Sequence, residues 1–231
     1  MPSSVIMLTI QLSKQVFCWP LFVPSLIGLQ DFIPKLKDHL LSRIHGDEWR
    51  GDVLQFQDAE RRDLHFVNNR MYNHQAIRFN YTTYDMRRDQ DSVSPNTHPD
   101  VMVISHEDDD ETNRHSYWYA RVLRIFHVFV QYRDIDGTLT RAVRMDVLWV
   151  RWFGRNVEVR SGWKAKRLHQ VGFLPVSDPG AFDFLDPDLV VRAIQLVPRF
   201  AAGRTPKLLG PSIVRPASDN DEDWQYFYVN M

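Results

Sequence analysis

The sequence predicts a mainly β fold with short helices (α+β), arranged as an antiparallel, partly closed barrel with irregular N- and C-terminal extensions. Tyr117–Tyr132 and Met145–Phe153 are long runs of aromatic and β-branched residues, which are typical of strands. Asp136 and Gly137 lie between the two runs and favour a type I′ turn that returns the second strand antiparallel to the first. The hydrophobic share of 44% in 231 residues is enough to fill a core.

Two helices are expected before the first strand. Leucines and an isoleucine recur at helical spacing after Pro34, so Pro34–Ile44 is predicted to be an amphipathic helix that ends at Gly46. A second helical turn is expected to start at Asp58, whose carboxylate can cap the free amides of residues 59–62.

Shorter strands are expected around the long pair. Leu64–Val67 and Met71–Tyr84 flank two asparagines that tolerate positive φ, which predicts a hairpin turning at Asn68 and Asn69. Residues 86–99 are polar and rich in turn formers, and Val101–Ile104 is a short apolar strand. Residues 138–143 are compatible with either a strand or part of a longer loop.

The C-terminal third is predicted to hold one more helical segment and one more strand. Asp186 as N-cap and Pro187 at the first helical position predict one or two helical turns over Leu189–Ile194. A strand over Gln195–Val197 then stops at Pro198. The aromatic segment Trp224–Tyr228 either docks back on the domain or pairs with a continuation of the chain.

These elements divide the chain into four parts. Residues 1–28 are an apolar extension that we place outside the domain, and residues 29–112 hold the helices, the hairpin and a solvated acidic loop at Glu107–Glu111. Residues 113–200 form the barrel core, and residues 201–231 form an extended tail. Pro20 and Pro24 interrupt the apolar extension, so it is too short for a membrane span, and we expect a soluble intracellular protein.

Composition limits the kinds of partner. The 28 basic and 29 acidic residues nearly cancel, so any contact with nucleic acid must come from a local cluster. Cys18 is the only cysteine, which excludes an internal disulfide and multi-cysteine zinc sites and is compatible with a reducing compartment.

Motifs that specify phosphate, dinucleotide, acyl or zinc chemistry are absent from the sequence. We therefore expect a non-catalytic protein with no cofactor, no metal site and no small-molecule substrate. Two groups of residues are the alternatives to this expectation as metal ligands. One joins His98 and His106 to Asp100 and Glu107, which we interpret as solvated loop residues. The other joins three carboxylates that ion pairs with neighbouring arginines explain better, namely Asp85, Asp89 and Asp91.

One stretch combines cations with aromatic rings, as phosphate contact and base stacking require. Glu158 is its only acid. The candidate nucleic-acid-binding residues are Arg151, Arg155, Arg160, Trp163, Lys164, Lys166 and Arg167. The competing interpretation is that the aromatic rings close the barrel core and that the cations are its solvated rim.

A second cluster of rings suggests a different ligand. Aromatic side chains can enclose a methylated ammonium group by cation–π attraction, and acidic residues lie nearby in the sequence. A histone tail is therefore a candidate partner, although core packing is the favoured explanation for any single ring. The candidate cage residues are Tyr117, Trp118, Tyr119 and Trp152.

Several sequence segments resemble, in the same order, segments of the C-terminal region of Plavaka-type transposases. These are proteins of CACTA-like mobile elements in basidiomycete fungi. The segments in this chain are Val67–Tyr72, Asn80–Arg88, Val147–Gly154, Gly162–His169 and Asp221–Tyr226. The resemblance covers about residues 29–231 and implies a nuclear protein that lacks the upstream catalytic core.

A looser resemblance links the barrel to bromo-adjacent homology (BAH) domains, which are β-rich chromatin and interaction modules. Tyr119–Phe126, Trp149–Phe153 and Phe184–Ile194 follow the order of their elements, but Gly154–Asn156 replaces the usual arginine and proline after the Trp-Phe pair. The transposase resemblance implies an accessory module that engages DNA or chromatin through the cationic aromatic stretch, and the BAH resemblance supports only an interaction role. The alternative is a protein-interaction or self-association domain without nucleic-acid binding.

Overall fold

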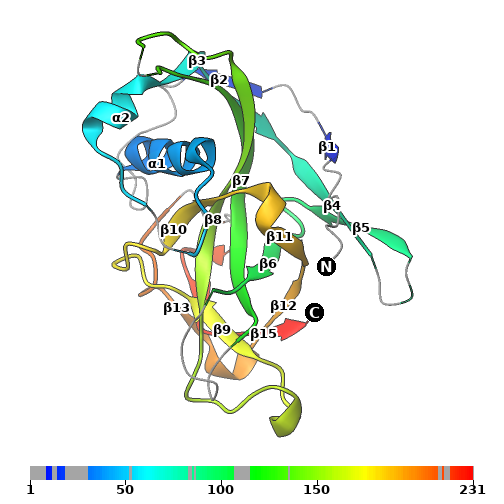
Figure 1. Ribbon diagram of the computed structural model, residues 1–231. Helices are drawn as coiled ribbons and strands as arrows, with labels where there is room; N and C mark the ends of the chain where they lie inside the picture. Colours follow the sequence, from blue (N-terminus) through cyan, green and yellow to red (C-terminus); the bar gives the residue numbers. More distant parts are fainter. Residues whose placement is uncertain are drawn as a thin grey trace.

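The computed structural model describes residues 9–11, 15–18, 31–51, 54–82, 85, 87–106, 115–134, 136–212, 215 and 219–230 (Figure 1). The helices are α1 (Phe32–His45) and α2 (Asp58–Asp63), and the 3-10 turns are η2 (Trp163–Ala165), η3 (Pro187–Leu189) and η4 (Phe200–Ala202). The strands are β1 (Thr9–Gln11), β2 (Gln15–Cys18), β3 (Leu64–His74), β4 (Ala76–Thr82), β5 (Arg88–Val93), β6 (Asp100–Ile104), β7 (Tyr117–Tyr132), β8 (Val143–Arg155), β9 (Gln170–Phe173), β10 (Phe182–Leu185), β11 (Val190–Ala193), β12 (Gln195–Pro198), β13 (Arg204–Thr205), β14 (Asp223–Trp224) and β15 (Phe227–Asn230).

The main sheet is antiparallel and nearly closed into a barrel, which confirms the predicted fold class. Its order is β11-β6-β7-β8-β9-β15-β12. Only Ile194 separates β11 from β12, so one continuous segment pairs with β6 at the first end of the sheet and with β15 at the other. The sheet therefore curls until its two ends meet on the same stretch of chain.

The long strands β7 and β8 hold the two halves of the molecule together. They pair from Tyr119 opposite Phe153 to Val130 opposite Val143, and both run through the centre of Figure 1. β6 and β9 flank one end of this pair, β3 flanks the other end on the β7 side, and β10 pairs with the middle of β8. The β7–β8 pairing was predicted from sequence. Its connection is a longer loop that contains Gly137, rather than a two-residue turn at Asp136 and Gly137.

The predicted hairpin at Asn68 and Asn69 is wrong. Both asparagines have positive φ, at 56° and 48°, but they lie inside one continuous strand, β3. The register between β3 and β7 shifts between Phe66 and Met71, so the pair forms a bulge rather than a reversal. Asparagine tolerates the left-handed conformation in both contexts, and sequence alone does not tell them apart.

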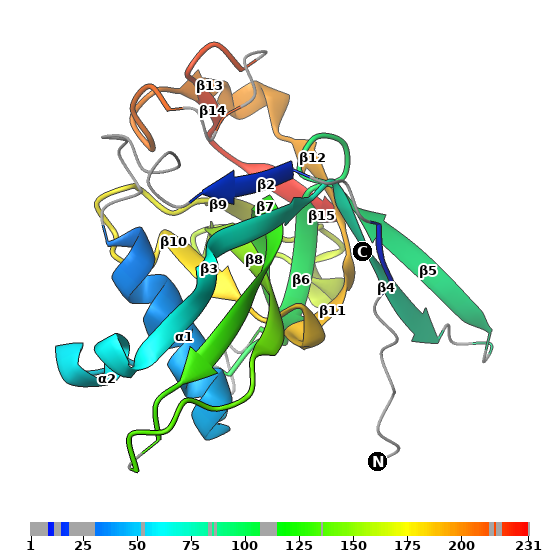
Figure 2. The same cartoon turned by 90° about the horizontal axis from the view of Figure 1, so that it is seen from above.

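The region expected to be rich in turns contains a strand instead. β5 pairs with β4 along its whole length, and the side chain of Gln90 donates to Asn80 Oδ1 at 2.7 Å. With β1 they form a separate three-stranded sheet, which projects from the barrel in Figure 2. The polar side chains of β5 are mostly exposed, whereas Val93 at its end is buried with Ile77 and Phe79 of β4 in a cluster shared with the barrel strands.

α1 packs across the outside of the sheet beside β10 (Figure 2). Its leucines Leu36, Leu40 and Leu41 are fully buried, and Gly46 ends the helix with φ of 75°, as predicted. α2 also forms, but Asp58 does not cap it. The helix starts after Gln57, whose amide donates to Glu60 Oε2 at 2.9 Å.

The predicted cap at Asp186 is confirmed, but the helical segment predicted after it is not. Asp186 accepts a hydrogen bond from the Asp188 amide at 3.0 Å and caps η3. The predicted helical turns over Leu189–Ile194 are wrong, because the chain continues as β11 and pairs with β6. A cap is a local signal, whereas the β-branched residues that follow it find a distant strand to pair with.

Both terminal regions contribute strands. Trp224–Tyr228 docks back on the domain: β14 pairs with β13, and β15 pairs with β9 and β12. In the region that we had placed outside the domain, β1 pairs with β4 and β2 pairs with β3. The predicted acidic loop at Glu107–Glu111 lies outside the described residues.

Charged residues lie inside the barrel. Arg121 on β7 and Arg151 on β8 are cross-strand partners, and each guanidinium lies over the ring of Phe173. Arg121 binds Asp100 with two hydrogen bonds of 2.7 and 2.9 Å. Arg151 binds Asp223 with two of 3.0 and 2.9 Å.

Asp223 is the shared anion of this interior. Its carboxylate also accepts two hydrogen bonds from Arg215, at 3.1 and 2.7 Å, and all three side chains are almost completely buried. Burial by itself would raise the pKa of Asp223, but the bonds from Arg215 and Arg151 hold it below its usual value. Asp223 therefore stays ionised and is the counter-ion that two buried cations share.

We predict that Asp223→Asn lowers the free energy of unfolding by about 3–5 kcal/mol, because it leaves two buried guanidinium groups without their anion. Chemical denaturation of the purified chain measures this. Asp221→Asn is the matched control, since that carboxylate is 58% exposed and lies 4.0 Å from Arg215. The control is expected to change stability by less than about 1 kcal/mol. Equal losses in both variants would contradict this account of the interior.

Candidate functional site

The cationic stretch singled out from sequence is the loop between β8 and β9, residues 156–169, which we call the cationic loop. It extends below the barrel in Figure 1. The Gly162 amide donates to the Arg167 carbonyl at 2.8 Å, and η2 lies between these two residues. Gly162 and Lys166 have positive φ, which lets the chain turn tightly at both sides of η2. The cationic loop therefore has a defined backbone conformation and projects from the rim of the barrel.

The structure brings most of the predicted cations to the surface of this loop. Glu158 is its only acidic residue, and Trp163 lies in η2. Four basic side chains are exposed to solvent, namely Arg160, Lys164, Lys166 and Arg167.

Arg151 was wrongly included in this surface set. Its side chain points into the barrel, is 2% exposed and is bonded to Asp223. The physical reason is the alternation of side chains along β8, which directs Arg151 inward and Trp152 outward. Arg151 is therefore a structural residue.

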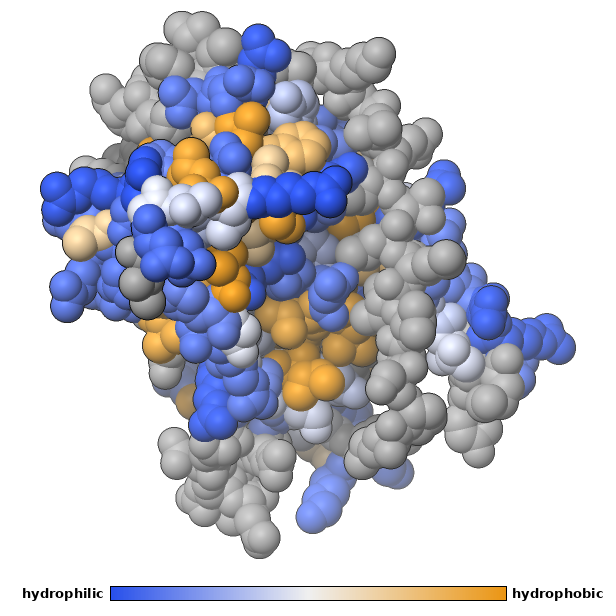
Figure 3. Space-filling model, turned by 45° about the horizontal axis from the view of Figure 1, so that its top comes forward, coloured by the Kyte–Doolittle hydropathy of each residue, from blue (hydrophilic) through white to orange (hydrophobic). Residues whose placement is uncertain are grey.

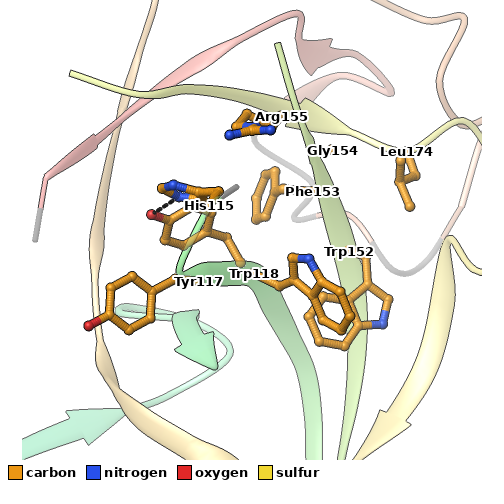
Figure 4. A pocket seen from close by; sticks show the side chains of 9 residues that line it. His115, Tyr117, Trp118, Trp152, Phe153, Gly154, Arg155 and Leu174 are labelled. Carbon is orange, nitrogen blue, oxygen red and sulfur yellow. Dashed lines mark hydrogen bonds between the residues drawn. The ribbon is translucent and has the colours of Figure 1, made fainter. Parts of the chain in front are cut away.

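A pocket of about 240 Å³ opens where β7 begins and β8 ends (Figure 4). The start of β7 and the residues just before it supply one side, and the last residues of β8 supply the other. Leu174, just after β9, completes the lining. The full set is His115, Tyr117, Trp118, Tyr119, Trp152, Phe153, Gly154, Arg155 and Leu174. All four candidate cage residues are among them.

Arg155 connects the pocket with the cationic loop. It is the last residue of β8, lines the pocket, and is followed directly by the loop. Figure 4 shows its guanidinium above the rings of His115 and Phe153. One continuous piece of chain therefore carries the positive pocket rim and the positive loop.

Three tryptophans form the apolar wall of the site. Trp118 and Trp152 meet edge to face with ring centroids 6.4 Å apart, and Trp49 contacts both, at 5.7 and 6.0 Å. Gly51, which has φ of 92°, lies directly against this wall. A Cβ atom at Gly51 would come within 2.2 Å of the Trp118 ring, so only glycine permits this packing.

The opposite wall is fixed by polar contacts. His115 Nε2 lies 2.8 Å from the Tyr119 hydroxyl, and the His115 ring packs on His169 at 4.3 Å between centroids. Burial raises the pKa of Tyr119, so its hydroxyl stays protonated at neutral pH. Because Tyr119 is buried and its hydroxyl is engaged, it shapes the pocket rather than offering a free ring face.

The arrangement differs from a cage around an ammonium group. Tyr117 and Trp118 are consecutive on β7 and point to opposite faces, and Figure 4 shows Tyr117 directed away from the two tryptophans. Arg155 adds a positive charge to the lining, which repels a cationic ligand. The chemistry of this pocket favours a flat neutral or anionic group.

The carboxylates weighed as metal ligands have other partners. Asp85 pairs with Arg87 at 2.9 Å, and Asp91 accepts a hydrogen bond from the Ala193 amide at 3.0 Å. Asp89 accepts a hydrogen bond from the Tyr81 hydroxyl at 3.2 Å.

The loop histidine arrangement does not assemble either. Asp100 is buried and bonded to Arg121, while the ring of His106 packs edge to face on Trp49 at 5.7 Å. Glu107 lies outside the described residues.

Some residues that line the pocket or pack against its tryptophans were not found from sequence. Trp49 and Gly51 lie in the segment between α1 and α2, about seventy residues before Trp118 along the chain. His115 and Leu174 lie just outside the strands whose ends form the pocket. Phe153 was noted only as part of the aromatic run. No local pattern marks these residues, because the strand register brings them together.

The chain matches no family model, no curated protein and no solved structure in comparisons with known proteins. Within the described part of the chain, no helix is both long and apolar enough to cross a membrane. The functional interpretation therefore depends on the pocket and on the cationic loop beside it.

We predict that Gly51→Ala displaces the Trp118 ring, because the new methyl group and the ring compete for the same space. Gly203→Ala is the matched control, since Gly203 also has positive φ, at 74°, but nothing lies within 4 Å of its added Cβ. Gly51→Ala should lose about 1–3 kcal/mol more stability than the control and should change the tryptophan fluorescence of the folded protein. An equal loss with unchanged fluorescence would argue against the tight packing of Trp118.

Proposed function

We propose that the chain is a non-catalytic nucleic-acid-binding module that prefers unpaired bases. The observation that carries the proposal is the continuity of Arg155 with both the pocket and the cationic loop. Proteins that bind single strands combine a cationic track for phosphates with aromatic rings for bases. This chain carries both parts side by side.

The electrostatic part of the argument is local. The whole chain has a formal net charge of −1, whereas the cationic loop carries four exposed basic side chains and one acidic residue. The loop therefore presents positive potential on a nearly neutral molecule, which attracts a phosphate backbone to one place. Such contacts release counterions, so binding must weaken as salt rises.

The aromatic part of the argument concerns the pocket. Trp118 and Trp152 are half-buried, so each ring retains part of its surface toward solvent. Stacking on a ring of this kind contributes about 1–3 kcal/mol per base and requires no particular sequence. Arg155 at the rim is placed to meet the phosphate that accompanies such a base.

The resemblance to Plavaka-type transposases supports the same role. There the catalytic core lies upstream, so this chain would be an accessory module that engages DNA or chromatin beside that core in the nucleus. The ion pairs and hydrogen bonds of Asp85, Asp89 and Asp91 favour a role without phosphoryl-transfer chemistry.

A protein partner is the second candidate function. Several large apolar side chains are exposed, among them Phe200 at 70%, Val157 at 66% and Ile104 at 59%. Figure 3 shows apolar side chains gathered on the central part of the face turned forward, beside hydrophilic ones. Apolar docking of a protein or of a second copy is insensitive to salt, so the salt series described next separates the two candidates.

We predict that the full chain binds labelled single-stranded DNA with an affinity that falls steeply with salt, measured by fluorescence anisotropy. Each lost phosphate contact reduces the slope of log K against log salt by about 0.7 for a single strand, so removing four cations should reduce it by about 3. The test variant changes Arg160, Lys164, Lys166 and Arg167 to Ala. The charge-matched control changes Arg70, Arg88, Arg141 and Lys207, which are also exposed, to Ala.

The control variant should bind like the unchanged chain. Binding that persists in the test variant, or that is lost equally in both variants, would sink the assignment to the cationic loop. No binding at low salt would move the function to the protein partner.

We also predict that Trp152→Ala weakens binding of a single strand by about 5- to 150-fold, equivalent to about 1–3 kcal/mol, because a stacking surface is lost. Duplex binding should change by less than about twofold, since paired bases do not enter the pocket. Trp224→Ala serves as the control, because Trp224 is also half-buried but packs on Phe200 and Arg204. Equal losses for single strands and duplex would contradict a base in the pocket.

A further inference from the structure

Two histidines and an aspartate meet on three neighbouring strands, away from the pocket. His74 lies on β3, His127 on β7 and Asp146 on β8. His127 is the direct cross-strand partner of Asp146, while Tyr72 is its partner on β3. Residues that alternate along β3 share a face, so all three side chains project from the same side of the sheet.

The geometry of the three side chains is close to that of a metal site. His74 Nε2 and His127 Nδ1 are 2.7 Å apart, and one candidate ligand atom from each residue lies within 4.8 Å of the other two. A tetrahedral ion with bonds of about 2.0–2.1 Å holds its ligand atoms roughly 3.3 Å apart. An opening of less than about 1 Å between the two rings would therefore admit the ion.

The rings are already fixed in position. Tyr72 stacks on His127 with centroids 4.7 Å apart and planes 7° apart, and Phe129 meets His127 edge on at 5.2 Å. Both histidines are 6% exposed. A neutral imidazole keeps one ring-nitrogen lone pair that can bind a metal ion.

The hydrogen bond between the two rings does not satisfy all of the ring nitrogens of this buried histidine pair. His74 Nδ1 is buried and has no hydrogen-bond partner among the described residues. Buried polar nitrogens are normally paired. Because His74 Nε2 is the atom that faces His127, Nδ1 is a separate unpaired nitrogen, and the histidine pair is not a closed hydrogen-bond network. Asp146 brings a carboxylate to the same place and is 25% exposed, which provides a route from solvent.

We propose that His74, His127 and Asp146 bind one divalent transition-metal ion of the Zn²⁺ class. Two imidazoles and a carboxylate suit such an ion and leave a further coordination position for water or another ligand. Arg144 binds Asp146 Oδ1 at 2.8 Å in the structure and is itself exposed. On metal binding its guanidinium is free to turn toward solvent. This site is independent of the proposed nucleic-acid binding.

The test is titration of the full chain, first treated with a chelator, with ZnCl₂ in a calorimeter and with CoCl₂ in a visible spectrometer. We expect one ion per chain, a raised melting temperature, and the absorption bands of Co²⁺ in a site of low symmetry. His127→Phe and Asp146→Asn should each weaken Zn²⁺ binding at least tenfold. His45→Ala and His98→Ala, which remove exposed histidines, should leave it unchanged.

Circular dichroism of each metal-free variant shows whether it is folded. If His127→Phe does not fold, Asp146→Asn carries the test, since its side chain is partly exposed and nearly isosteric with the original. Absence of tight Zn²⁺ binding, or binding that the ligand variants retain, would overturn the site and leave a purely structural histidine pair. Binding lost only in the two control variants would assign the ion to surface histidines and overturn it equally.

Discussion

The buried ion pairs inside the barrel are the constraint on which the rest of the structure depends. β7 and β8 each direct a guanidinium inward, at Arg121 and Arg151, and a buried cation is tolerated only beside an anion. Asp100 comes from β6 and Asp223 from β14, so the carboxylates lie on elements distant in sequence. Folding of the central strands is thereby tied to docking of the C-terminal segment. The same segment then supplies β15, which fills the gap between β9 and β12.

Sequence reasoning succeeded where local pattern and tertiary environment agree. Tyr117–Tyr132 is a strand because its apolar and β-branched residues fit both a pleated backbone and a buried sheet. The predictions were wrong where one local signal is compatible with two structures. Asn68 and Asn69 lie in a bulge rather than in a hairpin turn, and the cap at Asp186 precedes a short 3-10 turn and then strand β11 rather than a longer helix. Arg151 shows a third limit, because which face of a strand is interior depends on how the sheet closes.

The candidate site shows the same division. The chemistry of the aromatic and basic residues was visible in the sequence, and the structure gathers Tyr117, Trp118, Tyr119, Trp152 and Arg155 around one pocket. The sequence does not show how deeply each aromatic ring is buried, because strand register decides which rings face solvent. Trp49 and His115 join through contacts over long sequence separations. A sequence can thus suggest the ingredients of such a site, while only the fold decides their roles.

The segment that pairs at both ends of the main sheet also affects how other chains can attach. A sheet with a long open edge can be extended by a strand from another molecule, which is a common route to aggregation. Here Val190–Ala193 is already paired with β6 and Gln195–Pro198 with β15. Each of these end strands is paired on one side within the described structure, so a strand added at either end would lie against residues 190–198. One short segment of chain therefore governs both edges of the main sheet at which another molecule could pair.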